Sequence, residues 1–208
     1  MECMIEIENL SLTMKKQVIL SDINLTFEKG KIHGLIGRNG SGKTMLMKCI
    51  LGFIRPSQGT IWVDHKRIGK EVDFPPHTGV IIETPGFLPA LSGYKNLKIL
   101  ADLKGRIGKN EIIETLQRVG LNPKMKKPVS KYSLGMRQRL GIAQAIMENP
   151  DVLILDEPFN GLDKAGVAEM RQLLLSLKES GKAIMLASHN AQDIEMLCDY
   201  VHEMEDWK

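Results

Sequence analysis

The sequence has little of what a membrane span, a disulfide framework or a nucleic-acid surface requires. Its longest apolar runs, such as Val152 to Leu155, fall far short of the roughly 20 residues that cross a bilayer. Three cysteines, Cys3, Cys49 and Cys198, are an odd number without metal-ligand spacing, so we expect reduced thiols in the cytosol. No signal peptide is expected, and a net charge of +3 in 208 residues does not by itself indicate nucleic acid. A membrane role would require another polypeptide.

Length and patterning predict one domain with lobes, spanning residues 1–208. A chain of this length can bury one sizeable core with an inserted subdomain, but not two full catalytic units. The charged fraction of 25% is ordinary for a globular protein. No internal repeat is visible, which excludes a tandem arrangement.

One stretch has the pattern of a nucleotide-phosphate cradle. It is Gly37-Arg38-Asn39-Gly40-Ser41-Gly42-Lys43-Thr44, which fits G-x-x-x-x-G-K-[ST]. The glycines let backbone N–H groups point inward, and a following helix adds its positive N-terminal end. Lys43 brings a charge to the phosphates and Thr44 a hydroxyl for Mg²⁺. An apolar strand at 31–36 and a helix at 45–51 flank the loop, which favours nucleotide binding over an unoccupied glycine-rich turn.

Two kinds of strand pattern predict two kinds of sheet. Near the N-terminus apolar and polar residues alternate, which is typical of half-exposed antiparallel strands; the apolar members are Ile5, Ile7, Leu10, Leu12, Ile23, Leu25 and Phe27. Residues 60–63 are expected to join the same sheet. Continuous apolar runs at 79–82, 152–155 and 183–187 instead predict a parallel sheet covered on both faces.

Between these strands the apolar period changes to that of helices. We predict helices with Ser92 and Asn110 as N-caps and Gly105 and Gly120 as ends, followed by one from Ser133 to about Glu148. Asp163 and Asn190 are expected to cap the last two helices. The predicted fold is therefore an α/β nucleotide-binding fold with a parallel core sheet, an N-terminal antiparallel subdomain and an inserted helical subdomain.

Two carboxylates stand at the end of the buried strand 151–156. Asp156 is placed to hold Mg²⁺ opposite Thr44, and Glu157 is placed to orient or deprotonate water at the γ-phosphate. On its own, the Asp156-Glu157 pair would be equally compatible with a catalytic site and with a surface turn. His189 follows the strand 183–187 at the same predicted edge, where it is either an ordinary strand-end histidine or a hydrogen-bond donor to the γ-phosphate.

Taken together, these residues resemble the ATP-binding cassette ATPases over nearly the whole chain. The phosphate loop comes first, followed 40 positions past Lys43 by Glu83, where the family usually has glutamine. A signature segment, 132–140, keeps Ser133 and Gly135 of the usual L-S-G-G-Q. Asp156-Glu157, a D-loop-like segment 160–163 and His189 complete the order.

The resemblance implies a shared active site. Two cassettes would meet head to tail, so that Ser133 and Gly135 face the γ-phosphate held by the other chain's loop. It also implies catalytic roles for Lys43, Glu157, His189 and Asp163, with ATP and Mg²⁺ as cofactors. Expected partners are a second cassette, identical or closely related, and integral membrane permease subunits, with no nucleic acid; the chain would lie on the cytoplasmic face of the membrane.

Three features depart from the family pattern. Glu83 can still approach Mg²⁺, but its charge would alter metal affinity. Met14, ahead of Val18, occupies the position of the aromatic residue that usually stacks on adenine, which predicts looser base selectivity. From the residues 205–208 that close the sequence, we expect no accessory domain of the kind that some importers carry.

The stretches 82–92 and 132–136 most resemble the bacitracin and lantibiotic resistance branch of exporter cassettes. This predicts an ATPase subunit of an exporter, with a nucleotide-binding core at 1–84 and 149–208 and a helical subdomain at 85–148. Two alternatives stay open: an ATP-dependent switch acting on nucleic acid or ribosomes, and a regulatory module without useful hydrolysis.

Overall fold

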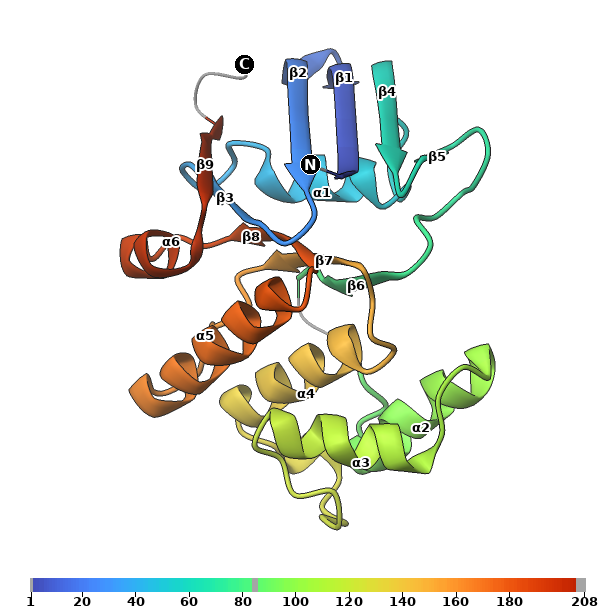
Figure 1. Cartoon of the computed structure of the whole chain (residues 1–208), viewed down its shortest axis with the longest axis vertical. Helices are drawn as coiled ribbons and strands as arrows, with labels where there is room; N and C mark the ends of the chain where they lie inside the picture. The colour runs from blue at the N-terminus through green and yellow to red at the C-terminus, as the bar shows by residue number, and fades with distance from the viewer. Residues whose placement is uncertain (1, 84–85, 205–208) are drawn as a thin grey trace.

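The computed structural model describes residues 2–83 and 86–204 and contains two β-sheets with a helix between them. One sheet is antiparallel, with four strands in the order β2-β1-β4-β5, and the other is parallel, with five strands in the order β6-β7-β8-β3-β9. Helix α1 (Lys43–Ile50) lies between them (Figure 1). The predicted α/β fold with a parallel core sheet and an antiparallel N-terminal sheet is confirmed.

The antiparallel sheet is formed by long strands with one buried face. Its strands are β1 (Cys3–Met14), β2 (Gln17–Glu28), β4 (Gln58–Val63) and β5 (Lys66–Arg67). Strand β1 pairs with both β2 and β4, as predicted for residues 60–63. Alternate apolar side chains of these strands pack with α1 in one core, which explains why the sequence alternates there.

The central strands of the parallel sheet are buried on both faces. The sheet consists of β3 (Ile32–Ile36), β6 (Thr78–Ile81), β7 (Val152–Asp156), β8 (Ala183–Ala187) and β9 (Tyr200–Glu203). Successive residues of β7 alternate between two cores: Val152 and Ile154 pack with α1, whereas Leu153 and Leu155 pack with the other helices. Each fully buried side chain of this kind contributes about 1.5–3 kcal/mol.

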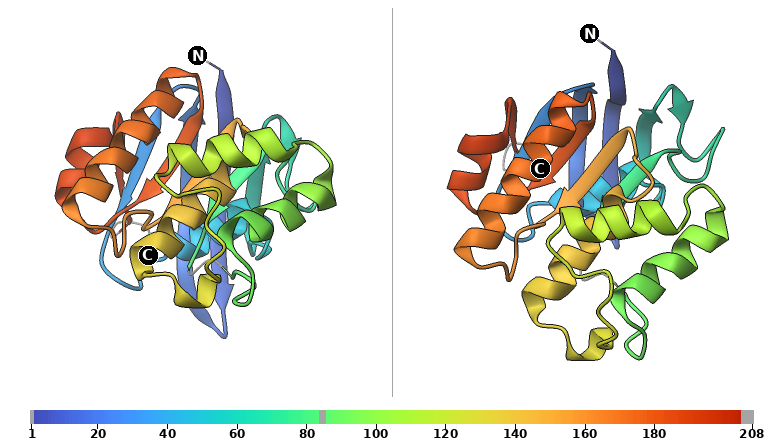
Figure 2. Two further views of the ribbon diagram at one scale, coloured as in Figure 1. Left: turned by 90° about the horizontal axis from the view of Figure 1, so that it is seen from below. Right: turned by 60° about the horizontal axis from the view of Figure 1, so that its bottom comes forward.

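The other helices lie on the face of the parallel sheet that is turned away from α1. They are α2 (Gly93–Lys104), α3 (Lys109–Arg118), α4 (Leu134–Ile146), α5 (Lys164–Glu179), α6 (Ala191–Leu197) and a short 3₁₀ turn η1 (Val129–Lys131). Figure 2 shows α2, α3 and α4 grouped in one lobe, with α5 and α6 on the other side of the molecule. The division into subdomains at 84/85 and 148/149 stays a prediction, and residues 84–85 lie outside the described chain.

Helix ends agree with the sequence in most places. The side chains of Ser92, Ser133, Asp163 and Asn190 each accept a hydrogen bond from a backbone N–H of the first turn, as predicted.

Two helix boundaries were wrong. Asn110 is not an N-cap, because α3 begins at Lys109 and the Glu111 carboxylate accepts the Gly108 N–H at 3.0 Å. The helix expected to run to about Glu148 ends at Ile146, where Met147 closes the last turn.

Within residues 2–83 and 86–204 no helix has both the length and the apolar character needed to span a bilayer. The C-terminal residues 205–208, which the sequence predicts to end the chain without an accessory domain, lie outside the described structure.

Candidate nucleotide site at the phosphate loop

The phosphate loop joins the end of β3 to the start of α1, and its glycines are required by the backbone. Gly37, Gly40 and Gly42 have φ of 146°, 81° and 105°, in the region that side chains disfavour. A Cβ on Gly42 would lie 2.7 Å from Leu20 Cδ2, so a larger residue would push against the β-sheet. The loop therefore holds a conformation that wraps its backbone around a central space.

Two side chains of the loop are preorganised for an anion. The Lys43 ammonium donates to the carbonyl oxygens of Gly37 at 2.5 Å and Arg38 at 3.1 Å, which folds the lysine back over the loop. Ser41 is 4% exposed, and its Oγ has no hydrogen-bond partner among the residues that the structure describes. A buried hydroxyl without a partner is costly, and a phosphate oxygen would satisfy it.

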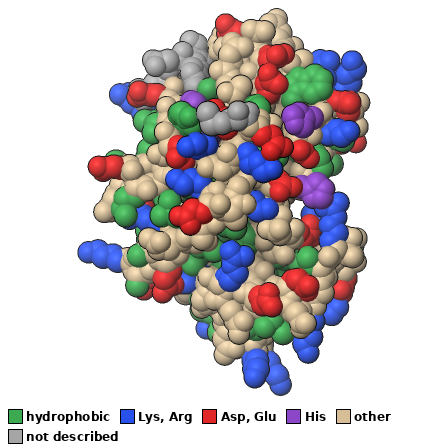
Figure 3. Space-filling view, in the orientation of Figure 1, with side chains coloured by type: hydrophobic (Ala, Val, Ile, Leu, Met, Phe, Trp, Pro, Cys, Tyr) green, Lys and Arg blue, Asp and Glu red, His purple; other side chains and the backbone are tan. Residues whose placement is uncertain are grey.

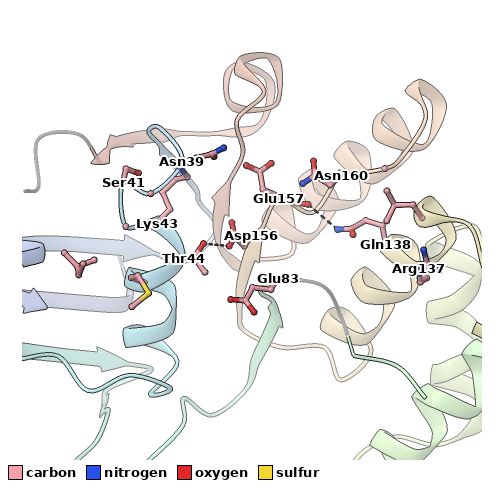
Figure 4. Close-up of a pocket in the computed structure, with 16 residues that line it drawn as sticks. Asn39, Ser41, Lys43, Thr44, Glu83, Arg137, Gln138, Asp156, Glu157 and Asn160 are labelled. Atoms are coloured by element: carbon pink, nitrogen blue, oxygen red, sulfur yellow. Dashed lines mark hydrogen bonds between the residues drawn. The ribbon is translucent and has the colours of Figure 1, made fainter. Parts of the chain in front are cut away.

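Thr44 and Asp156 bring two oxygen donors together across the site. The Thr44 hydroxyl donates to Asp156 Oδ2 at 2.7 Å, joining the first turn of α1 to the end of β7. Figure 4 shows this pair at the centre of the site, beside Lys43. No group of three or more His, Cys, Asp or Glu side chains in the described ranges could hold a metal alone. The hard-oxygen pair nevertheless fits Mg²⁺, which uses one or two protein ligands together with nucleotide phosphates.

Glu157 and His189 form a second pair on the same sheet edge. His189 Nδ1 lies 2.8 Å from Glu157 Oε2, as expected from the ends of β7 and β8. Burial raises the pKa of Glu157, and the hydrogen bond and charge of His189 act in the opposite direction without cancelling it. Glu157 also has φ of 49°, a left-handed conformation that is uncommon outside glycine and that aims its side chain at the site.

Lys43, Thr44, Asp156 and Glu157 line one open cavity of about 810 Å³, a size typical of ligand sites. Its wall contains loop residues Asn39 to Thr44, the Asp156-Glu157 pair and Glu83. On the opposite side stand residues of α4 and of the segment after Glu157, including Arg137 and Asn160 (Figure 4).

Several predicted site residues lie near this cavity without lining it. Ser133 and Gly135, at the start of α4, are outside its wall, as are Asp163 and His189. The Asp163 carboxylate accepts the Gly166 N–H at 2.9 Å as the cap of α5. A Cβ on Gly135 would lie 2.9 Å from the Gly161 carbonyl oxygen, so the signature and D-loop-like segments pack directly on each other.

Met14 and Val18 lie at the tip of the β1–β2 hairpin. Their side chains are exposed, and neither lines the cavity. Ile19, one residue further along β2, does line it. The sequence did not single out Ile19, because its position follows from the register of the long hairpin.

Gln138 is a second residue that the sequence did not single out. Its side-chain amide donates to the carbonyl oxygens of Glu157 at 3.3 Å and Pro158 at 2.9 Å, and Figure 4 shows it reaching across from α4. This buried contact ties the signature helix to the backbone that carries Glu157. Its only sequence signal was its place five residues after Ser133, next to a motif.

Glu83, at the end of β6, is brought to the cavity but is also paired with a cation. Its carboxylate contacts the Lys48 ammonium at 2.5 Å. Its backbone φ is 58°. The sequence placed Glu83 near the metal, but did not identify its ionic partner on α1.

A parallel sheet, a glycine loop around a central space and an acidic strand end define a nucleotide-hydrolysing enzyme of the phosphate-loop class. A family model described as "ABC transporter" matches residues 20–160. The bacitracin transport ATP-binding protein BcrA of Enterococcus faecalis is 45% identical over 212 residues, covering 99% of this chain and 68% of that protein. The lantibiotic transport ATP-binding protein SrtF of Streptococcus pyogenes is 39% identical over 198 residues, covering 95% and 85%.

A solved structure titled "Structure of ATP binding subunit of ABC transporter" superimposes with a TM-score of 0.86 at 28% identity, covering 96% of this chain and 85% of that one. The chain belongs to the ABC transporter family and is an ATPase that binds ATP. The predicted resemblance to the bacitracin and lantibiotic branch is confirmed.

Proposed function

We propose that this chain is the ATP-hydrolysing subunit of an exporter that drives separate membrane-spanning subunits and protects the cell against antimicrobial peptides or related drugs. The observation that carries this proposal is that Thr44, Asp156 and Glu157 line one cavity, with Thr44 paired to Asp156 and Glu157 paired to His189. The transport names of BcrA and SrtF support the exporter role and the kind of substrate.

The site residues divide the work of phosphoryl transfer to water. The loop N–H groups from Gly37 to Thr44 bind the phosphates, and Lys43 balances charge on the β- and γ-phosphates. Thr44 and Asp156, with Glu83 near them, hold Mg²⁺, which when bound neutralises charge on the phosphate oxygens. Glu157 orients and deprotonates the attacking water.

Two further residues act at the γ-phosphate end. His189 contacts Glu157 and its side chain is exposed, so it can donate to a phosphate oxygen while holding the carboxylate in place. Asp163 caps α5 next to the segment 160–162 and keeps that segment near the reacting centre.

A second cassette completes each site in this proposal. Ser133 is exposed at the N-terminus of α4 and does not line the cavity of its own chain. The exposed N-terminus of α4, at the rim of the cavity, could then meet the phosphate held by a facing chain. Two chains, identical or closely related, would then close around two ATP molecules, and hydrolysis would release them.

A separate groove is proposed to receive a cytoplasmic helix of the membrane subunit. The groove has a volume of about 360 Å³, and apolar residues of its wall include Phe53, Val80 and Ile82. Phe53 is 55% exposed and packs edge-on against the exposed Phe74. Exposed aromatic side chains of this kind mark protein contacts. Docking there would place the chain at the cytoplasmic face of the membrane.

A nucleic-acid partner is the rival reading, and the face in Figure 3 gives it little support. Lys and Arg side chains intermingle there with Asp and Glu, whereas a nucleic-acid footprint gathers one sign of charge.

Co-expression with candidate integral membrane subunits tests the proposal. Detergent-solubilised membrane protein should co-purify with the wild-type chain, and Phe53→Asp should abolish co-purification while leaving ATP binding intact. Retention of both by the variant would contradict the groove assignment. Salt-sensitive binding to DNA or RNA, without a membrane partner, would contradict the exporter role.

A further inference from the structure

Lys48 and Glu83 form an ion pair at the border between the nucleotide cavity and the neighbouring groove. The ammonium of Lys48 contacts Glu83 Oε1 at 2.5 Å. Glu83 lines both cavities, whereas Lys48 lines the groove. Figure 4 shows the Glu83 carboxylate below the Thr44–Asp156 pair. One carboxylate therefore stands where it can act on the metal and is held there from the groove side.

Glu83 adds negative charge to a site that already contains two carboxylates. Asp156 and Glu157 line the same wall, and the ligand proposed for this cavity is a polyphosphate. A third carboxylate repels that ligand unless a cation balances it. The Lys43 ammonium is assigned to the phosphates rather than to Glu83, and the Arg137 guanidinium donates to the Tyr132 carbonyl oxygen.

Lys48 is placed by secondary structure to balance this charge. It lies four residues after Thr44 on α1, so both side chains project from the same side of the helix. Its side chain is 25% exposed, whereas that of Glu83 is 65% exposed, so the rigid helix holds the more buried partner. Glu83 lies just beyond the end of β6 and has φ of 58°, so its backbone is in the left-handed region rather than in a strand conformation.

We propose that Lys48 is a positioning residue for the ATPase site: it neutralises Glu83 and sets how strongly that carboxylate acts on the metal-bound nucleotide. This inference rests on the proposed function, because it assumes Mg²⁺ and ATP in the cavity. With the pair intact, the Lys48 ammonium offsets the charge that Glu83 adds to the site. Without Lys48, the free carboxylate repels metal-free ATP and binds Mg²⁺ more strongly.

The test is a double-mutant cycle of Lys48→Met and Glu83→Gln, read by calorimetric titration with ATP in EDTA and with ATP in Mg²⁺. For each protein, the quantity compared is the dissociation constant for ATP in EDTA divided by the dissociation constant for ATP in Mg²⁺. A fraction of misfolded protein cancels in this ratio, so a purely structural defect leaves it unchanged. Lys48→Arg should retain the wild-type ratio. Lys98→Met, which removes the exposed Lys98–Asp102 pair on α2, is the matched control.

Lys48→Met should raise the ratio about two- to five-fold, the range that one surface ion pair can supply. In the Glu83→Gln background the same substitution should leave the ratio unchanged. The inference would be overturned if Lys48→Met changed the ratio equally in the wild-type and Glu83→Gln backgrounds, or if it changed the ratio in neither background. Both results would leave the proposed function intact. Failure of the wild-type chain to bind ATP in either buffer would overturn both.

Discussion

Glu157→Gln is the substitution that most sharply separates binding from hydrolysis. The change removes a charge but no atoms beyond an oxygen-to-nitrogen exchange. The Glu157 N–H still donates to the Ala187 carbonyl at 2.9 Å, and its own carbonyl still accepts from Gln138. The left-handed backbone at this position is therefore retained, and a glutamine can still contact His189.

The expected size of the effect follows from the role of the carboxylate. A positioned general base contributes about 10²- to 10⁴-fold to rate, equivalent to about 2.7–5.5 kcal/mol of activation free energy. Burial raises the pKa of Glu157, which means that the ionised form is held against a desolvation cost. The neutral glutamine avoids this cost, so folding stability and ATP affinity at neutral pH should equal or exceed those of the wild type.

Three measurements on the variant test this reasoning. Calorimetry should show retained ATP binding, single-turnover phosphate release should be slowed by at least about 100-fold, and size-exclusion chromatography with ATP should show an accumulated dimer. Glu114→Gln, an exposed change on α3, serves as the charge-matched control. Phosphate release within threefold of the wild-type rate would show that Glu157 does not act on the attacking water.

Three other substitutions have distinct expected outcomes. Lys43→Ala should lower ATP affinity by at least about tenfold in calorimetry, because a charge-assisted contact worth about 1.5–3 kcal/mol is lost; unchanged affinity would contradict the phosphate assignment. Ser133→Arg should abolish steady-state turnover while ATP binding to the monomer is unchanged, and an active variant would argue against a shared site. Asp199→Asn should destabilise the fold by about 1–2 kcal/mol at neutral pH. Burial alone would raise the pKa of Asp199, but the Ile32 N–H and the Lys178 ammonium outweigh it and lower the pKa. Stability from this carboxylate is present above the unfolded pKa and lost as pH falls through the folded pKa, so the wild type and variant should converge in acid denaturation once the pH is below the lowered folded pKa. A constant difference between them at all pH values would contradict this linkage.

The parallel core could be predicted because its strands are buried on both faces. Runs such as 152–155 and 183–187 have no polar positions, and only a doubly covered sheet produces them. Strand β9 was missed for the opposite reason: Tyr200–Glu203 is mostly exposed and polar, and its pairing is supplied by the edge of β3. An edge strand of this kind has no pattern of its own.

Contacts near a motif could be predicted, whereas contacts between distant elements could not. Glu157 and His189 end neighbouring parallel strands, so their proximity follows from topology. Lys48 and Glu83 are joined by no period or motif, since their contact depends on how α1 lies against the end of β6. The loop glycines were predicted from their motif, but the hairpin register that places Ile19 in the cavity was not, because Lys15 and Lys16 adopt a left-handed turn that their residue type does not signal.

The central claim is that each chain supplies the phosphate loop to one ATP and the Ser133 end of α4 to the ATP of its partner. Mixing Lys43→Ala protein with Ser133→Arg protein tests this directly, because only a mixed pair contains one loop and one signature segment that are both intact. Each variant alone should be inactive, and an equal mixture should recover about a quarter of wild-type turnover, since about half of the pairs are mixed and each has one working site of two. A mixture as inactive as its components would contradict the shared-site account.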